Sequence, residues 1–307
     1  MRQAEHLVEA ATLIVLVVGP LALRLAGFLR MHRATADPVA ERAHPWDWQL
    51  AITSALLYAL AFNLVFFIQE LFLVIPKALT PGLRPILFHN NHSWTGENPL
   101  ASLFQGTGAL AIFATGAMCA LLLKLRPARS ASARLFLIWM AYNGFLQSLP
   151  QVVIGSVERE NDVGMAMDYL HFGVTAKTVA AVVALIAIAV VALFLRGPLL
   201  SLAQNANDIA SGRARASFMF RVATVPAFAA ILLIIPFRVP RNWVEVVAVP
   251  VVVTLIGVAW IQAGAWAISQ VKASGTLSSK SVVYAVGALL ILLLVFQLVL
   301  RPGVRFY

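Results

Sequence analysis

The chain has 307 residues, of which 61% are hydrophobic and only 12% are charged. Soluble globular domains have roughly 45–50% apolar and about 25% charged residues. A mean hydropathy of +0.85 leaves too few polar side chains to cover a water-facing surface of this size. The composition therefore excludes a soluble enzyme, a disordered chain and a fibrous repeat. We expect a single integral membrane domain over residues 1–307, in contact with the lipid bilayer.

The formal net charge is +10, from 23 Lys and Arg against 13 Asp and Glu. No basic patch with interleaved aromatic residues occurs, so we expect no nucleic-acid partner. The chain has one cysteine, Cys119, which excludes an intramolecular disulfide and a thiolate metal cluster. No phosphate-binding glycine loop and no GxSxG motif is present, which argues against ATP-driven or serine-hydrolase chemistry.

Apolar runs long enough to cross about 30 Å of hydrocarbon predict eight helices. In chain order they cover residues 7–29, 48–76, 101–124, 134–156, 174–195, 219–237, 243–268 and 282–300. The first run lacks a small-residue cleavage site, so we interpret it as a retained span. Polar residues and Pro150 interrupt the fourth. The expected fold is an all-α, polytopic transmembrane helix bundle of about eight spans.

The basic residues are divided unequally between the two sides of these spans. One side has 14 of the 23 Lys and Arg residues and the other has 9. Because basic residues are enriched in cytoplasmic loops, the side with 14 is predicted to be cytoplasmic, with both termini on the opposite side. The short connectors are typical of a bacterial-type inner (cytoplasmic) membrane.

Two helices have polar side chains at helical spacing. Glu70 follows Asn63 by seven residues and stands next to Gln69, and the fourth helix has amides every four residues. A buried ionisable residue indicates a functional site because its burial costs free energy. We expect the second and fourth helices to pack together, with Glu70 accepting hydrogen bonds from the fourth. Interhelical hydrogen bonding without further function remains an alternative. The amides of the fourth helix are Asn143, Gln147 and Gln151.

Two non-cytoplasmic connectors contain candidate metal ligands. Residues 80–99 include His89 and His92, three positions apart, and residues 158–173 include Asp162. With Glu70 these side chains would supply two nitrogens and two oxygens, a set that suits a divalent metal such as Zn²⁺. The alternative is that the histidines, with Trp94, anchor the connector at the lipid headgroups.

Three segments together resemble a degenerate version of the site-2 protease family of intramembrane zinc metalloproteases. The sequence Gln69-Glu70-Leu71-Phe72-Leu73 lies where that family has HExxH, and residues 106–111 provide a small-residue segment. Residues 143–150 and Asn161-Asp162-Val163-Gly164 then follow in the family's order. The resemblance covers about residues 50–170 and implies a helical membrane fold, Glu70 as general base and Asp162 as ligand. Both zinc-binding histidines are replaced, by Gln69 and Leu73.

Three functions remain open from the sequence. The first is a metal-dependent, hydrolase-like site near the non-cytoplasmic face, with Glu70 as base or ligand and His89, His92 and Asp162 as ligands. The second is a small transporter or channel in which Glu70 is an ion or proton site. The third is a non-catalytic subunit that binds a membrane-protein partner. The sequence alone does not decide whether the chain is an enzyme.

Overall fold

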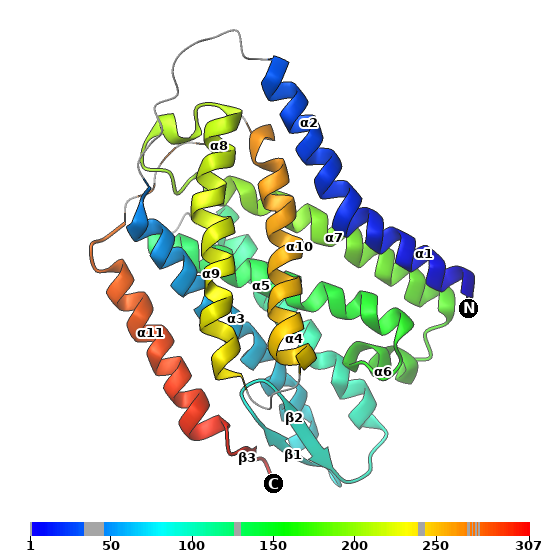
Figure 1. Cartoon of the computed structure of the whole chain (residues 1–307). Coiled ribbons are helices and arrows are strands. Elements are labelled where there is room, and N and C mark those ends of the chain that lie inside the picture. Colours follow the sequence, from blue (N-terminus) through cyan, green and yellow to red (C-terminus); the bar gives the residue numbers. More distant parts are fainter. Residues whose placement is uncertain are drawn as a thin grey trace.

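The computed structural model describes residues 2–33, 46–125, 130–238, 243–268, 271, 273, 275 and 277–307. These residues form an all-α bundle with a small sheet at one end (Figure 1). The eight long helical segments are α1–η1–α2 (Arg2–Leu13, Ile14–Val18, Gly19–Arg33), α3 (Trp48–Ala78), α4 (Leu100–Leu125), α5 (Ala131–Val157), α7 (Val174–Leu200), α8–η3–α9–η4 (Gly212–Met219, Phe220–Thr224, Val225–Ile234, Ile235–Phe237), η5–α10–η6 (Val244–Ala248, Val249–Gly264, Ala265–Ala267) and α11–η7 (Ser281–Val295, Phe296–Leu300). Two short elements, α6 (Asp162–Tyr169) and η2 (Ala206–Ile209), lie in connectors.

Seven of the eight segments are long and apolar enough to span a membrane, counted over the described residues. The eighth, α5, is more polar and lies in the middle of the bundle, where most of its residues from Ile138 to Leu149 are fully or nearly fully buried. The predicted all-α membrane bundle is confirmed, and each predicted span corresponds to one of these segments. The arrangement is that expected of a multi-pass membrane protein.

The two central helices begin at polar caps. The side chain of Asp47 accepts a hydrogen bond from Leu50 N at the start of α3, and Ser130 accepts one from Ala133 N at the start of α5. Such caps satisfy backbone N–H groups that have no partner in the first helical turn. Each helix then continues past a proline, Pro76 in α3 and Pro150 in α5. As a result, α3 continues to Ala78, two residues beyond the predicted end of the span.

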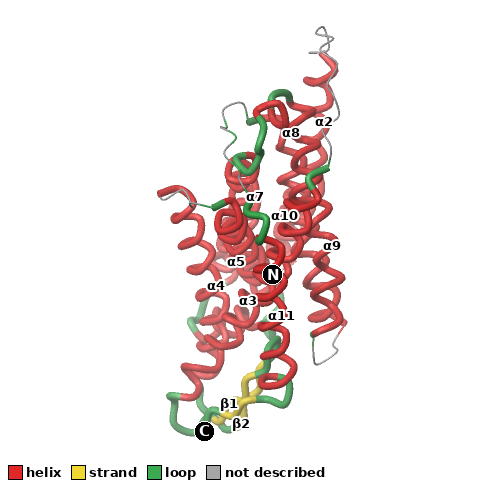
Figure 2. The backbone as a smooth tube through the Cα atoms, turned by 90° about the vertical axis from the view of Figure 1, so that its left-hand side faces the viewer, coloured by secondary structure: helices red, strands yellow, loops and turns green. Residues whose placement is uncertain are grey.

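A small antiparallel sheet closes one end of the bundle (Figure 2). Strand β1 (Arg84–Leu87) pairs with β2 (His92–Thr95) on one edge and with β3 (Val304–Arg305) on the other. In this register Leu87 lies opposite both His92 and Val304. Residues 84–95 of the connector over residues 80–99 thus form a β-hairpin, which was not predicted from the sequence. We call this end of the bundle the hairpin end.

Helices α4 and α5 approach closely at Gly116 and Gly144. A Cβ atom added to Gly144 would lie 2.7 Å from Gly116 Cα and 2.7 Å from Ile112 O. These are backbone atoms, so the two helices would have to separate to accept a methyl group. Small residues commonly allow such close backbone approach between transmembrane helices.

We expect Gly144→Ala to lower the unfolding midpoint of the purified protein in detergent. The added methyl group overpacks the crossing, which typically costs about 1–3 kcal/mol. The matched control is Gly287→Ala in α11, where a Cβ atom would have no neighbour within 4 Å. That change should be neutral or stabilising, because alanine is the better helix former. Equal midpoints for the two variants would contradict the close crossing.

Candidate functional site

The carboxylate of Glu70 in α3 lies against the hairpin. Its Oε2 atom is 2.9 Å from His92 Nδ1 at the start of β2, and the two side chains are only 5% and 7% exposed. The hairpin is held in place by its pairing with β3 and by apolar contacts of Val74 and Leu87 with Phe296. The C-terminal strand thus helps to position His92 beside a carboxylate inside the bundle.

The other ring nitrogen of His92 faces a second group of buried side chains. His92 Nε2 lies 3.0 Å from Gln105 Oε1 in α4, and Lys77 Nζ donates to the same oxygen at 2.6 Å. The amide nitrogen of Gln105 donates to Asp162 Oδ1 at 2.9 Å, at the N-terminus of α6. We call Glu70, Lys77, His92, Gln105 and Asp162 the charged network.

Hydrogen-bond roles in the charged network fix the orientation of the Gln105 amide group. Gln105 must present its oxygen to Lys77, because an ammonium group only donates, so its amide nitrogen faces Asp162. His92 has the Glu70 carboxylate as an acceptor at Nδ1 and Gln105 Oε1 as an acceptor at Nε2, and Lys77 Nζ also lies 3.5 Å from Nε2. With both ring nitrogens protonated, two positive and two negative side chains balance. Loss of one proton from the His92–Glu70 pair leaves a net negative charge in a region of low dielectric constant.

Asp162 has the electrostatic environment expected of a member of this network. Burial raises the pKa of its carboxyl group, the nearby His92 and Lys77 lower it, and the Glu70 carboxylate raises it. Asn161 caps α6 by accepting a hydrogen bond from Val163 N, which places Asp162 in the first helical turn. An acidic side chain there also interacts favourably with the helix dipole.

Amide side chains continue from the charged network toward the middle of the bundle. Gln151 donates to Gln69 Oε1 at 2.8 Å, and Gln147 donates to Asn143 Oδ1 at 3.2 Å and to Phe62 O at 3.3 Å. The predicted pairing of the second and fourth helices is therefore present. The predicted partner of Glu70 was wrong, because Gln69, one position earlier, faces α5 and Glu70 faces the hairpin. Asn63 donates to Ala59 O in its own helix.

The polar contacts extend beyond the amides to the opposite end. Asn143 donates to Trp139 O, Trp139 Nε1 donates to Ser54 Oγ at 3.1 Å, and Ser54 Oγ donates to Val222 O at 2.6 Å. Beside them, Tyr58 and Thr254 share a hydrogen bond of 2.7 Å. Gln147 Oε1 is buried and has no hydrogen-bond partner in the part of the chain that the structure describes. We call the series from Gln69 to Val222 the polar path, and its members are Gln69, Gln151, Gln147, Asn143, Trp139, Ser54 and Val222.

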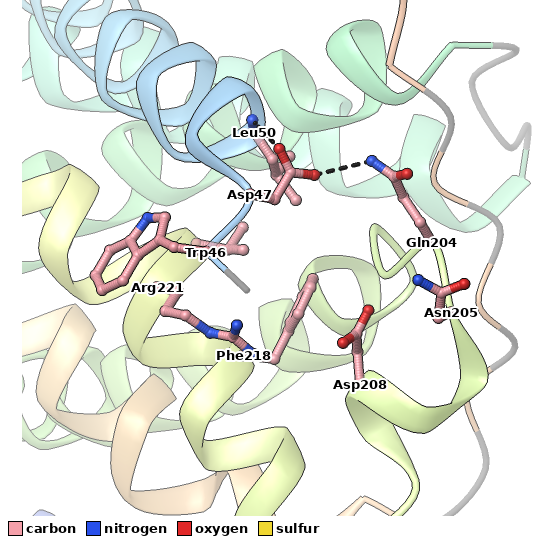
Figure 3. A pocket seen from close by; sticks show the side chains of 9 residues that line it. Trp46, Asp47, Leu50, Gln204, Asn205, Asp208, Phe218 and Arg221 are labelled. Atoms are coloured by element: carbon pink, nitrogen blue, oxygen red, sulfur yellow. Dashed lines mark hydrogen bonds between the residues drawn. The ribbon is translucent and has the colours of Figure 1, made fainter. Parts of the chain in front are cut away.

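The polar path ends at a pocket of about 210 Å³ (Figure 3). This pocket lies at the start of α3, at the end of the bundle away from the hairpin (Figure 1). Asp47 Oδ2 accepts a hydrogen bond from Gln204 at 2.8 Å on one side of it. The lining comprises Trp46, Asp47, Leu50, Gln204, Asn205, Asp208, Phe218, Arg221 and Val222. Because Val222 belongs both to the pocket and to the polar path, hydrogen-bonding groups run from this pocket to Gln69 beside the charged network.

The structure separates the two predicted histidine ligands. His89 Nε2 contacts Phe237 O at 3.1 Å, and its ring stacks on Phe296 at a centroid distance of 5.0 Å, whereas His92 faces Glu70. Asp162 reaches His92 through Gln105. Within the described ranges, no group of three or more His, Cys, Asp or Glu side chains is arranged to hold a metal ion. The predicted ligand set is therefore not assembled around one point.

Sequence reasoning missed two members of the charged network. Lys77 lies seven residues after Glu70, on the same face of α3, and it supplies a buried cation. The seven-residue spacing of Asn63, Glu70 and Lys77 could have indicated that Lys77 shares their helix face. The predicted helix ended at Pro76, however, and therefore did not include Lys77. Gln105 gave no comparable signal, because a single amide near a helix start is common.

A comparison of the chain with models of protein families, with curated proteins and with solved structures finds no match. The functional interpretation therefore depends on the geometry of the charged network and of the polar path.

Replacing Lys77 by methionine should destabilise the protein by about 3 kcal/mol, because it leaves the two carboxylates without their buried cation. We expect the unfolding midpoint in detergent to fall, and the double variant Lys77→Met/Asp162→Asn to recover part of the loss. The exposed Lys124→Met is the matched control. If Lys77→Met had as small an effect as Lys124→Met, the charged network would not contribute to stability.

His89 predicts a dependence of stability on pH. Its pKa is lowered to about 4, mainly by burial and then by the charge of Arg238, with a smaller effect of Arg301, while the contact with Phe237 O acts in the opposite direction. An unfolded histidine has a pKa near 6.5. The unfolded chain therefore binds more protons between about pH 6.5 and 4, and stability falls as the pH decreases through this range, by at most about 3 kcal/mol.

In His89→Gln this part of the pH dependence should disappear, measured as the unfolding midpoint at pH 7, 5.5 and 4.5. His6→Gln is the control, because the His6 side chain is 74% exposed. A wild-type profile identical to that of His89→Gln would show that His89 is not buried in its neutral form.

Proposed function

We propose that the chain is a multi-pass membrane protein that moves protons across the bilayer, with the Glu70–His92 pair as its proton-binding site. The observation that carries the proposal is the direct contact of a carboxylate and an imidazole inside a membrane bundle, 2.9 Å apart. Ionisable groups are rare within membrane spans and mark proton relays and ion pathways. A histidine that gains or loses one proton between two acceptors is suited to such a role.

The charge balance of the network supports proton binding. When His92 is doubly protonated, its charge and that of Lys77 offset those of Glu70 and Asp162. Releasing the proton breaks this balance by one charge, in surroundings where charge interactions are much stronger than in water. The pair therefore has two states that differ by one proton and that respond to the field and the pH on either side.

The polar path marks the route along which protons would cross the bundle. It leads from Gln69, next to Glu70, through α5 to the pocket that Val222 lines. Amide side chains do not relay protons by themselves, so we propose that water molecules beside them do. The unpartnered Gln147 Oε1 is an acceptor to which such a water would donate.

We prefer transport to the metal-dependent hydrolase interpretation. A hydrolytic metal site needs three or more ligands around a common point. Here His89 contacts the Phe237 carbonyl group, and His92 is already held between Glu70 and Gln105. The polar path instead places hydrogen-bonding groups between Gln69, next to Glu70, and the pocket, where water molecules beside them could carry protons.

We further propose that the protein resides in an inner (cytoplasmic) membrane with the hairpin end outside, because 14 of the 23 basic residues belong to the other side of the spans. In this orientation the charged network exchanges protons with the non-cytoplasmic solution, and the pocket opens toward the cytoplasm. The proposal requires the lipid bilayer as its one partner.

Purified protein reconstituted into liposomes with an internal pH-sensitive dye tests this function. A potassium gradient with valinomycin imposes an inside-negative potential, and we expect wild-type vesicles to acidify. Glu70→Gln should reduce the rate at least tenfold, because a neutral amide cannot take up the proton. Glu70→Asp should retain part of the flux, since it keeps a carboxylate.

Glu97→Gln is the matched control, because it removes an exposed carboxylate from the same end of the bundle and should leave the flux unchanged. Acidification at the same rate in wild-type and Glu70→Gln vesicles would refute the role of Glu70, and no acidification above empty liposomes would refute proton transport.

A further inference from the structure

Arg238 is a buried cation that the charged network does not include. It follows η4 directly and is 1% exposed, among the largest fully buried side chains of the described residues. All three of its guanidinium nitrogens are buried without a hydrogen-bond partner among the described residues. A guanidinium group has five N–H donors and remains charged in proteins. Burying these donors without hydrogen bonds destabilises a protein by much more free energy than a typical side-chain contact contributes.

The face of the guanidinium group stacks on aromatic rings, and its buried edge has no hydrogen-bond partner among the described residues. Its central carbon lies 4.1 Å from the centroid of the Phe66 ring and 5.5 Å from that of Phe62, both in α3. Such cation–π contacts fix the position of the group without using its N–H donors. Those donors form a planar fork, which is the geometry that binds a carboxylate through two parallel hydrogen bonds.

Arg238 reaches the interior of the bundle. Phe66 is one helical turn before Glu70 in α3, on the side away from the hairpin end. The carboxylates of Glu245 and Glu70 are near enough to act on the Arg238 charge, Glu245 the more strongly, yet no ion pair joins either of them to it in the part of the chain described. Glu245 Oε2 is also buried, with no hydrogen-bond partner within the described ranges. A donor and an acceptor are thus both unsatisfied in one region.

We infer that Arg238 binds a small carboxylate anion, whose two oxygens accept hydrogen bonds from the guanidinium edge. The rings of Phe62 and Phe66 suit the apolar part of a short-chain acid such as acetate. Glu245 Oε2 remains as an acceptor for a hydroxyl group, an amine or a water molecule that accompanies the anion. Arg238 is 1% exposed, which favours a small anion from solution over a bulky lipid headgroup.

This inference deepens the proposed function by naming the solute that moves with the proton, and it rests on that function only for the transport step. One proton on the Glu70–His92 pair and one carboxylate on Arg238 together carry no net charge. Binding itself depends on Arg238 and needs no proton movement, so the two proposals fail separately.

Isothermal titration of the purified full-length protein in detergent, in chloride-free HEPES buffer, tests the inference. Acetate, chloride and phosphate are titrated separately. We expect saturable binding of acetate, weaker binding of chloride and no binding of phosphate, whose tetrahedral, multiply charged form does not match an enclosed site with one cation. Arg238→Gln should weaken acetate binding about 10- to 100-fold, the effect of losing a charge-assisted hydrogen-bonding group.

Arg238→Lys keeps the charge but removes the fork, so it should also weaken binding, and it provides a second variant if Arg238→Gln does not fold. Arg305→Gln is the matched control, an exposed arginine at the hairpin end, and should bind acetate like the wild type. Acetate binding that survives both Arg238 variants, tighter binding of chloride or phosphate, or no saturable acetate binding with normal proton flux would each overturn the carboxylate site. Acetate binding without proton flux would support the site and reject the proposed transport.

Discussion

The placement of a carboxylate inside an apolar helix is the constraint on which the hairpin end depends. Glu70 must be hydrogen-bonded or protonated to lie there, and neighbouring spans alone do not provide the partner. The chain instead folds residues 84–95 back as a hairpin, so that His92 reaches Glu70. Strand β3 then braces the hairpin, and α4 and α6 contribute Gln105 and Asp162. The three strands, including the C-terminal β3, and the short helix α6 therefore all help to hold the buried Glu70–His92 pair in place.

The spans could be predicted from the sequence because their signal is local. Each apolar run is long enough to cross hydrocarbon, and each became a long helix. The pairing of α3 with α5 was also predictable, since polar residues at helical spacing in two apolar helices must face a common interior. The partner of Glu70 was not, because it depends on a hairpin whose strands are four residues long. Gln151 donates its hydrogen bond to Gln69, which is one position before Glu70 in α3, so the predicted contact was wrong by one residue.

The two histidines show why spacing alone was insufficient. Three positions apart on a helix, His89 and His92 would lie on one side. In the hairpin, His89 belongs to the turn and His92 begins β2, so their side chains leave in different directions. His89 enters an apolar environment at Phe296, and His92 stacks beside Trp94 with Lys77 over the same indole ring. The metal-site hypothesis assumed a local conformation that the strand pairing excludes.

Helix α3 connects the two unusual charges of the bundle. Glu70 extends from it toward the hairpin, and Phe66, one turn earlier, holds the guanidinium group of Arg238. Charges this close interact strongly where water is excluded, so the charge on one site alters the free energy of charging the other without any movement of the helix. An anion at Arg238 adds negative charge near Glu70 and favours a proton on the Glu70–His92 pair. By thermodynamic linkage, a proton on the Glu70–His92 pair strengthens binding of the anion by the same factor. Proton binding and anion binding can therefore be coupled in a rigid bundle.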